Sequence, residues 1–141
     1  KGEMCAGGLL KLNFVKKKFS LSYQNQKINF RSIEVDHGKI KSIGYIFNQT
    51  AYISDCSGIN NDQLKKLKNL KLFIIDCLRF NPHYSHFSYE DVLKIVDYIK
   101  PKKTILTNLH TDIDYNYILK KVPAHVQPAF DNMKFLILKK I

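Results

Sequence analysis

Two short, largely apolar runs separated by a capped amphipathic helix limit what this chain can fold into. The runs are Leu72–Ile75 and Thr104–Thr107, and such runs are typical of strands covered on both faces. Between them, residues 89–100 carry one apolar stripe at helical spacing. Ser88 can cap this helix and Pro101 ends it. A strand, a helix and a second buried strand in this order predict neighbouring parallel strands in a layered α/β fold.

The rest of the chain predicts further strands and two more helices within a single domain. Alternating apolar and polar residues favour half-buried strands in the first part of the chain. The expected elements are two hairpins (Phe19–Tyr23 with Lys27–Val35, and Ser42–Phe47 with Ala51–Ser54), helices over Asp62–Leu70 and Tyr115–Lys121, the latter capped by Asp114, and a final strand over Lys134–Leu138. We expect one domain over residues 1–141, with a mixed sheet covered by helices on one face. Residues 1–18 are expected to form a tail or a severed connection.

Length and hydropathy exclude several classes of protein. A chain of 141 residues can bury one core but is short for two ordinary domains. Nine Phe and eight Tyr supply apolar surface that a disordered chain lacks. No apolar run reaches the roughly 18–20 residues of a membrane-spanning helix. The first residues also lack the apolar stretch of a secretory signal, so we expect a cytoplasmic protein.

The formal net charge of +11 invites a nucleic-acid-binding interpretation, which the residue types weaken. The basic residues are almost all lysines, and Arg31 and Arg79 are the two arginines. Arginine is the residue that reads phosphates and bases with a bidentate fork. A solvated basic surface is therefore favoured, and nucleic-acid binding stays an alternative. The three cysteines form no CxxC pair, so neither a disulfide framework nor a cysteine-built zinc site is favoured.

Polar side chains recur where the predicted strands end, which is where layered α/β folds usually carry their function. His and Asp, the ligand types for zinc, manganese or iron, are well represented among them. The set comprises His37, Asp55, Asp76, His83, His86, Asn108, His110, Asp112 and Asp114. Their spacings are long, so no local motif identifies a metal. Some of these residues have a structural alternative as helix caps or turn formers.

Five segments, in order along the chain, resemble the metallo-β-lactamase-fold hydrolases, and most of all their cyclic-phosphate phosphodiesterase branch. They are VDHGKIKSIGYIF, AYISDCSGI, LFIIDCLRFNPHYSHFSYEDVL, TILTNLHTDIDY and VQPAFDNM. The resemblance implies a four-layer αββα sandwich with a two-metal site at one edge of the sheets. It also implies a metal-dependent hydrolase that cleaves phosphodiesters, and zinc or manganese as the metal.

The resemblance assigns roles to individual residues of this chain. His37 resembles a ligand of the first metal, and Asp55 resembles the carboxylate that bridges both metals. His86 resembles a histidine on the substrate side, which contacts the phosphate or protonates the leaving oxygen. Many relatives have LTH where this chain has Asn108, so we expect His110, two residues later, to be the last metal ligand. Nearby metals can hold a phosphodiester and activate a water, and a histidine suits the proton transfer.

Further residues near these positions are expected to act on the ligands or on the substrate. Asp76 and His83 are candidates for contacts to the ligands or the substrate, as is Asn108. Arg79 is a candidate phosphate contact. Cys56, next to the expected bridging carboxylate, is expected to pack rather than to bind a metal.

The family's most diagnostic motif, HxHxDH, is absent from this chain. We therefore expect the chain to be the C-terminal half of such an enzyme, with one metal or none and little activity alone. An uncovered sheet face would favour self-association, for example as a homodimer. The alternatives are a folded module that binds or dimerises without catalysis, and a basic nucleic-acid-binding protein.

Overall fold

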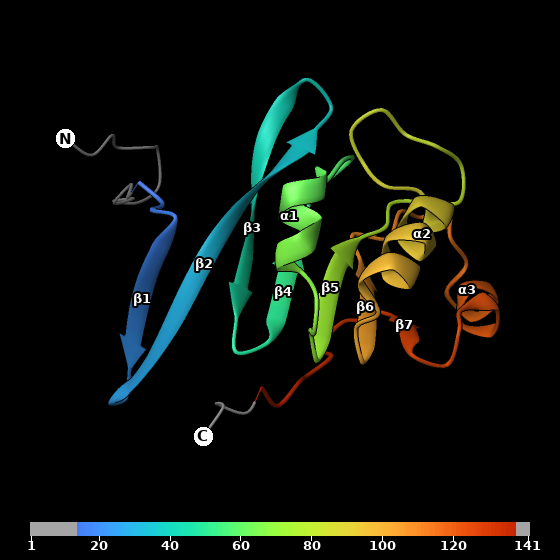
Figure 1. The fold of residues 1–141 in the computed structure, drawn as a ribbon. Helices are drawn as coiled ribbons and strands as arrows, with labels where there is room; N and C mark the ends of the chain where they lie inside the picture. Colours follow the sequence, from blue (N-terminus) through green and yellow to red (C-terminus); the bar gives the residue numbers. More distant parts are fainter. Residues whose placement is uncertain (1–13, 138–141) are drawn as a thin grey trace, which may run out of the picture.

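A single mixed sheet organises the molecule. The computed structural model describes residues 14–137. Its seven strands lie side by side in the order of the chain, from β1 to β7 (Figure 1). The strands are β1 (Lys18–Tyr23), β2 (Gln26–His37), β3 (Ile40–Phe47), β4 (Thr50–Ile53), β5 (Leu72–Asp76), β6 (Lys103–Thr107) and β7 (Val126–Pro128). The helices are α1 (Asn61–Lys66), α2 (Tyr89–Ile99) and α3 (Tyr115–Lys121). This mixed α/β architecture confirms the predicted fold class.

The first four strands are antiparallel, and both predicted hairpins are present. Gln24 and Asn25 join β1 to β2, and Asn48 and Gln49 join β3 to β4, all four with positive φ. Two consecutive residues with positive φ make the turn whose twist matches that of a hairpin. Because β1 begins at Lys18, the strand starts one residue inside the expected tail.

The remaining strands are parallel, as the alternating strands and helices predict. The predicted capping box at the start of α2 is confirmed, since Ser88 and Asp91 bond each other's backbone N–H groups. The Asp114 side chain caps α3 by accepting from Tyr117 N. These caps satisfy N–H groups that the helix itself leaves free. They also fix where the chain leaves each preceding loop.

Two predicted elements are wrong: the final strand is absent from residues 134–137, and the first helix is shorter than expected. The last strand of the sheet is β7, whereas residues 134–137 form no strand and residue 138 lies outside the described part. The short connection after α3 brings Val126 directly beside Thr104 of β6, so the edge position is already filled when the chain reaches Lys134. Helix α1 ends at Lys66 rather than at residue 70, because the chain turns at Asn69 with φ 62°.

The core lies between the sheet and the helices α1 and α2, which share one face (Figure 1). Phe73 and Ile75 of β5, with Val92 of α2, are among its fully buried residues. The opposite face keeps apolar side chains partly exposed, among them Ile43 at 39% and Tyr52 at 40%. Within residues 14–137, no helix has the length and apolar character needed to cross a membrane.

Candidate metal centre

One edge of the sheet collects the polar residues that follow the strands. His37 ends β2, Asp76 ends β5, and Asp55 and Asn108 come shortly after β4 and β6. These four strands run in the same direction, because β2 and β4 flank the antiparallel β3 and β4 to β6 are parallel. Their carboxyl ends therefore meet at one edge. The predicted gathering of polar residues at the strand ends is present.

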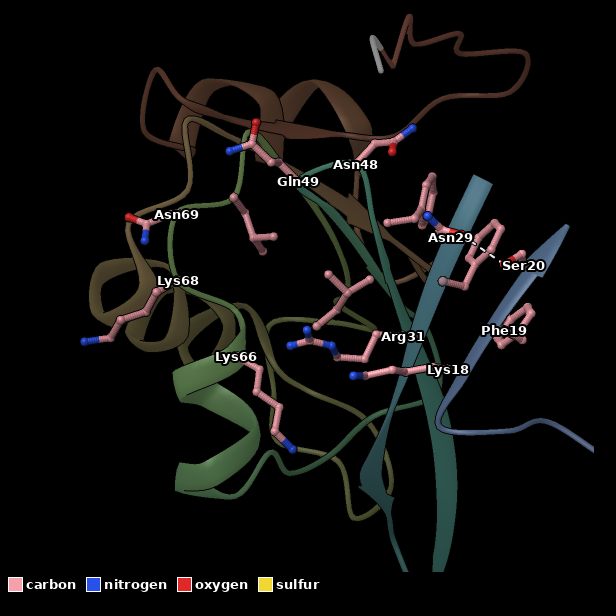
Figure 2. A pocket seen from close by; sticks show the side chains of 14 residues that line it. Lys18, Phe19, Ser20, Asn29, Arg31, Asn48, Gln49, Lys66, Lys68 and Asn69 are labelled. Atoms are coloured by element: carbon pink, nitrogen blue, oxygen red, sulfur yellow. Dashed lines mark hydrogen bonds between the residues drawn. The ribbon is translucent and has the colours of Figure 1, made fainter. Parts of the chain in front are cut away.

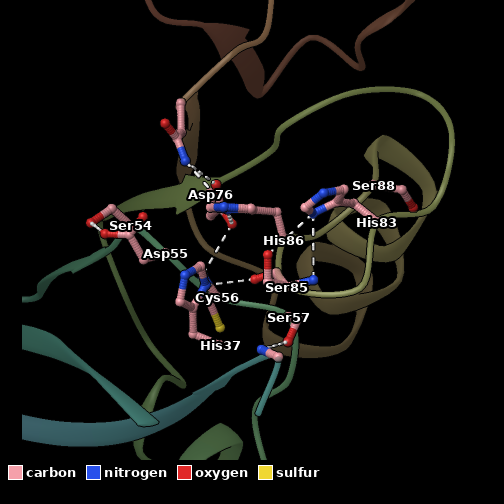
Figure 3. Close-up of polar contacts among 12 residues, drawn as sticks. His37, Ser54, Asp55, Cys56, Ser57, Asp76, His83, Ser85, His86 and Ser88 are labelled. Carbon is pink, nitrogen blue, oxygen red and sulfur yellow. Dashed lines mark hydrogen bonds and ion pairs between the residues drawn. The ribbon is translucent and has the colours of Figure 1, made fainter. Parts of the chain in front are cut away.

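Three side chains converge there. One potential ligand atom from each of His37, Asp55 and His86 lies within 4.8 Å of the other two (Figure 3). The rings of the two histidines meet edge to face, with centroids 4.7 Å apart. His37 and His86 are partly buried and the Asp55 side chain is exposed, so the group opens to solvent on the aspartate side.

His37 is held by the loop between β5 and α2. Its Nδ1 lies 2.7 Å from the carbonyl oxygen of Ser85, which can only accept. Nδ1 therefore carries the hydrogen, and Nε2 of the neutral ring keeps its lone pair. The strand end itself is fixed from the other side, because Asp36 N donates to Gly58 O and Gly38 N donates to Ser57 Oγ. This brings the end of β2 beside the residues that follow Asp55.

Asp76 holds the second histidine from beneath the site. Its carboxylate is fully buried and accepts from three donors: Cys56 N at 3.0 Å, His86 Nδ1 at 2.8 Å and Asn108 Nδ2 at 2.9 Å. The bond to His86 again places the hydrogen on Nδ1 and directs Nε2 away from Asp76. Asn108 Nδ2 also lies 3.3 Å from His86 Nδ1, but both atoms bear hydrogens aimed at the carboxylate. The carboxylate thus joins three segments far apart in the sequence.

Two of the residues at this edge adopt left-handed backbone conformations. Asp55 has φ 43° and Asn108 has φ 62°. Asp and Asn tolerate this region better than other non-glycine residues, because their side chains can bond nearby backbone groups. The conformation turns the chain sharply just after each strand. Asp55 makes one long contact, from Ser54 Oγ at 3.4 Å, and otherwise leaves its carboxylate available.

The two remaining loop candidates lie beside the group without joining it. His83 Nδ1 contacts Ser85 Oγ at 3.3 Å, and its ring lies 5.4 Å from that of His86. Desolvation and the charge of Arg79 lower the pKa of His83 below its usual value. Arg79 donates from Nη2 to Pro82 O, which closes the loop on itself. Arg79 therefore shapes the loop that presents both histidines.

His110, the expected last ligand, is not among the three converging residues. Its ring is half exposed, and Nδ1 lies 3.1 Å from the carboxylate of Asp112. His110 and Asn108 instead line a hollow of about 850 Å³ that also includes Asp131. Sequence reasoning placed His86 at this site on the substrate side, but it missed that His86 lies close enough to His37 and Asp55 to share a ligand with them. The supporting role of Ser85 was missed as well, since it acts through a backbone carbonyl that any residue could supply.

The donor set suits a divalent cation. Two imidazoles with their Nε2 atoms free, together with one carboxylate, are ligands that zinc and manganese accept. Each histidine has its other nitrogen bonded to an oxygen, as is usual for metal-binding histidines. Cys56 is buried, and burial raises the pKa of its thiol to about 12. Its role is therefore one of packing, as expected.

Comparison with known proteins places the chain among related folds. The sequence profile of the beta-lactamase superfamily domain matches residues 10–108. An octanoyltransferase of Porphyromonas gingivalis is 25% identical over 135 residues, which cover 94% of this chain and 27% of that protein. A diphosphatase from the PhnP family is 26% identical in sequence, with a TM-score of 0.79.

Two further solved structures share the fold. They are the short form of human tRNase Z (18% identity, TM-score 0.62) and YhfI of Bacillus subtilis, a metallo-beta-lactamase fold protein (13% identity, TM-score 0.64). This chain covers 47% of the diphosphatase, 48% of tRNase Z and 51% of YhfI. The same alignments cover 87% of this chain for the diphosphatase, 86% for tRNase Z and 82% for YhfI. It thus spans about half the length of these structures.

Proposed function

The chain belongs to the beta-lactamase superfamily. On that basis, we propose that it supplies metal ligands to a metal-dependent hydrolase of phosphoester bonds. The observation that carries this proposal is the convergence of His37, Asp55 and His86 at the sheet edge. The two histidines are pre-oriented, since each already donates its Nδ1 hydrogen within the protein. The proposed metal is zinc or manganese. Only one is expected to bind to this chain alone.

The chemistry of the proposed reaction follows from what the residues can hold. A bound divalent cation would polarise the phosphoryl oxygens and lower the pKa of an attacking water. Asp55 offers an uncommitted carboxylate on the open side of the group, where a substrate would enter. His37 is anchored to the loop carbonyl of Ser85, so its Nε2 keeps one direction while the substrate binds.

His86 can serve this site in two ways that an experiment separates. We propose it as a ligand, because its potential ligand atom lies within 4.8 Å of those of His37 and Asp55. The proton-donor role implied by the sequence resemblance stays a prediction and requires Nε2 to be free of the metal. In the His86→Gln variant, a ligand role lowers metal affinity, whereas a proton-donor role lowers turnover and leaves metal affinity unchanged.

The roles expected for His110, Asn108, His83 and Arg79 stay predictions. His110 could bind a metal only if its ring left the carboxylate of Asp112. Of Asn108 and His110, Asn108 is the one connected to the histidine pair, because it donates to the same Asp76 carboxylate that holds His86. We propose that its amide fixes the carboxylate that orients His86.

The proposed substrate class is the phosphodiester, with a small cyclic phosphate as the first candidate. The similarity to a diphosphatase from the PhnP family and the five segments quoted above support a phosphoester substrate. The similarity to the octanoyltransferase does not extend the proposal to acyl transfer, because the aligned part is 27% of that protein. A cytoplasmic location stays a prediction.

The partner that we propose is a second sheet over the uncovered face. Partly exposed apolar side chains line that face, including Leu21, Ile43 and Tyr52. Burying such a patch is favourable by about 25 cal/mol per Å² of apolar surface. In the isolated chain we propose that a second copy covers it, which predicts a homodimer. A folded dimerisation module without catalysis is the alternative.

The experiment is a hydrolysis assay with bis(4-nitrophenyl) phosphate and a cyclic phosphodiester, with added zinc or manganese. The chain is assayed alone and together with the part of the PhnP-family diphosphatase that it does not cover. We expect metal-dependent turnover in the mixture, little in the chain alone, and a loss in Asp55→Asn. His125→Gln, outside the cluster, is the control. Turnover that is equal in wild type and Asp55→Asn would contradict the proposal.

A further inference from the structure

A groove far from the metal centre is lined by positive charge. It has a volume of about 660 Å³ and lies between the β1–β2 hairpin and α1 (Figure 2). Its lining includes Asn48 and Asn69, which precede β4 and β5, whereas Asp55 and Asp76 lie at the other ends of these strands. The groove and the metal centre therefore occupy opposite edges of the sheet. The groove shares no residue with the proposed hydrolase site.

Every charged residue that lines this groove is basic. Lys18 and Arg31 come from the hairpin, Lys66 and Lys68 come from α1 and the turn after it, and no Asp or Glu contributes. None of the ion pairs within residues 14–137 involves any of these four residues. Lys66 contacts Gln63 Oε1, and Lys68 lies over the Tyr98 ring, so neither ammonium group is paired with a carboxylate.

Two of the cations lie directly opposite each other in the sheet. Lys18 pairs with Arg31 in the β1–β2 register, which places both side chains on the same face. In Figure 2 both extend toward Lys66 across the groove. Like charges opposite one another destabilise an antiparallel pair. An anion bound between them would remove that repulsion, so the arrangement favours an anionic ligand.

The other lining residues indicate which anion fits. Asn48, Gln49 and Asn69 provide amides that both donate and accept, as base edges do. Phe19 and Phe30 stack with centroids 5.1 Å apart, but they alternate with Lys18 and Arg31 along the strands, so their rings lie on the other face of the hairpin. The groove therefore offers cations for a phosphate backbone and amides for base edges, and those edges are unpaired in a single strand. An acidic peptide would use the cations and leave the amides without base edges to pair with.

We propose that the groove formed by β1, β2 and α1 binds single-stranded nucleic acid through its phosphates, without sequence preference. Three of the four groove cations are lysines, which bind phosphates as point charges, and backbone binding needs no bidentate base readout. The net charge of +11 raises the local concentration of any polyanion, and the groove is where the strand is held.

The test is fluorescence anisotropy with a fluorescein-labelled oligouridine, titrated from roughly 50 mM to 200 mM salt. The groove variant is Lys18→Gln, Arg31→Gln, Lys66→Gln. The matched control, Lys94→Gln, Lys102→Gln, Lys120→Gln, removes the same charge from other surfaces. We expect the groove variant to bind about tenfold more weakly, with a salt slope that is shallower by about 2. The control is expected to change the affinity less than about threefold.

Several results would overturn the proposal. They are an absence of binding at low salt, equal weakening by the groove and control variants, and displacement by polyglutamate as effective as by unlabelled oligouridine. A duplex that competes as well as the single strand would also contradict it. Circular dichroism checks the fold of each variant. Lys66→Glu, on an exposed helix surface, gives a second variant that leaves both hairpin strands unchanged and should also weaken binding.

Discussion

The buried pair of Asp76 and His86 predicts a strong coupling that can be measured without any metal. The Asp76 carboxylate is fully buried, and the His86 side chain is 14% exposed. Replacing Asp76 by Ala leaves Cys56 N and His86 Nδ1 without an acceptor in a buried position, whereas Asn108 can turn toward water. Unpaired buried donors cost about 1–3 kcal/mol each. Asp76→Ala should therefore destabilise the fold by about 3–5 kcal/mol, in line with other broken buried pairs.

A double-mutant cycle with Asp76→Ala and His86→Ala isolates the pair. Urea unfolding in the presence of EDTA should give a coupling of about 1.5–3 kcal/mol, the value for a hydrogen bond to a charged group. His110 and Asp112 form the matched control, because their side chains are 50% and 55% exposed at a similar distance of 3.1 Å. The control cycle should give about 0–1 kcal/mol. Equal couplings in the two cycles would refute the reasoning.

Three further predictions concern the scaffold. Gly44→Ala should destabilise the fold by about 1–3 kcal/mol in chemical unfolding, because its Cβ would lie 2.8 Å from a side-chain carbon of Ile53. Ser88→Ala should cost about 1 kcal/mol by loss of the α2 cap, seen as a lower urea midpoint with an unchanged m-value. Burial raises the pKa of Cys56 and of Cys77 to about 12, so few of these thiols are ionised at pH 8. In a Cys5→Ser variant, a thiol reagent should label the native protein negligibly. After unfolding, the reagent should label both Cys56 and Cys77.

Local signals explain which parts of the fold could be predicted. The caps at Ser88 and Asp114 act within three residues, so they are visible in the sequence. The strand-end positions of His37 and Asp55 also follow from local patterns, because strands running in one direction end at one edge. The hairpins are predictable for the same reason, because alternating apolar and polar residues lie on either side of each short turn.

Long-range contacts explain what could not be predicted. His86 reaches the site because the loop after β5 folds back, with Phe87 N bonded to Cys56 O and Leu78 N bonded to Phe87 O. Nothing in the residues around His86 encodes those partners. His110 was favoured by its distance from the end of β6, yet its backbone N–H bonds Leu78 O and its ring meets Asp112. The place beside β6 is taken by Val126–Pro128 rather than by residues 134–137. Local patterns do not resolve which of these two segments pairs with β6.

The central claim is that His37, Asp55 and His86 together form a divalent-metal site, and metal content tests it most directly. The purified chain is incubated with zinc and manganese, passed through a desalting column and analysed by mass spectrometry. The account predicts close to one metal per chain, lost in the His37→Ala, His86→Ala double variant and retained in His110→Ala. No metal in the folded wild type, or metal that is lost in His110→Ala and kept in the double variant, would contradict it.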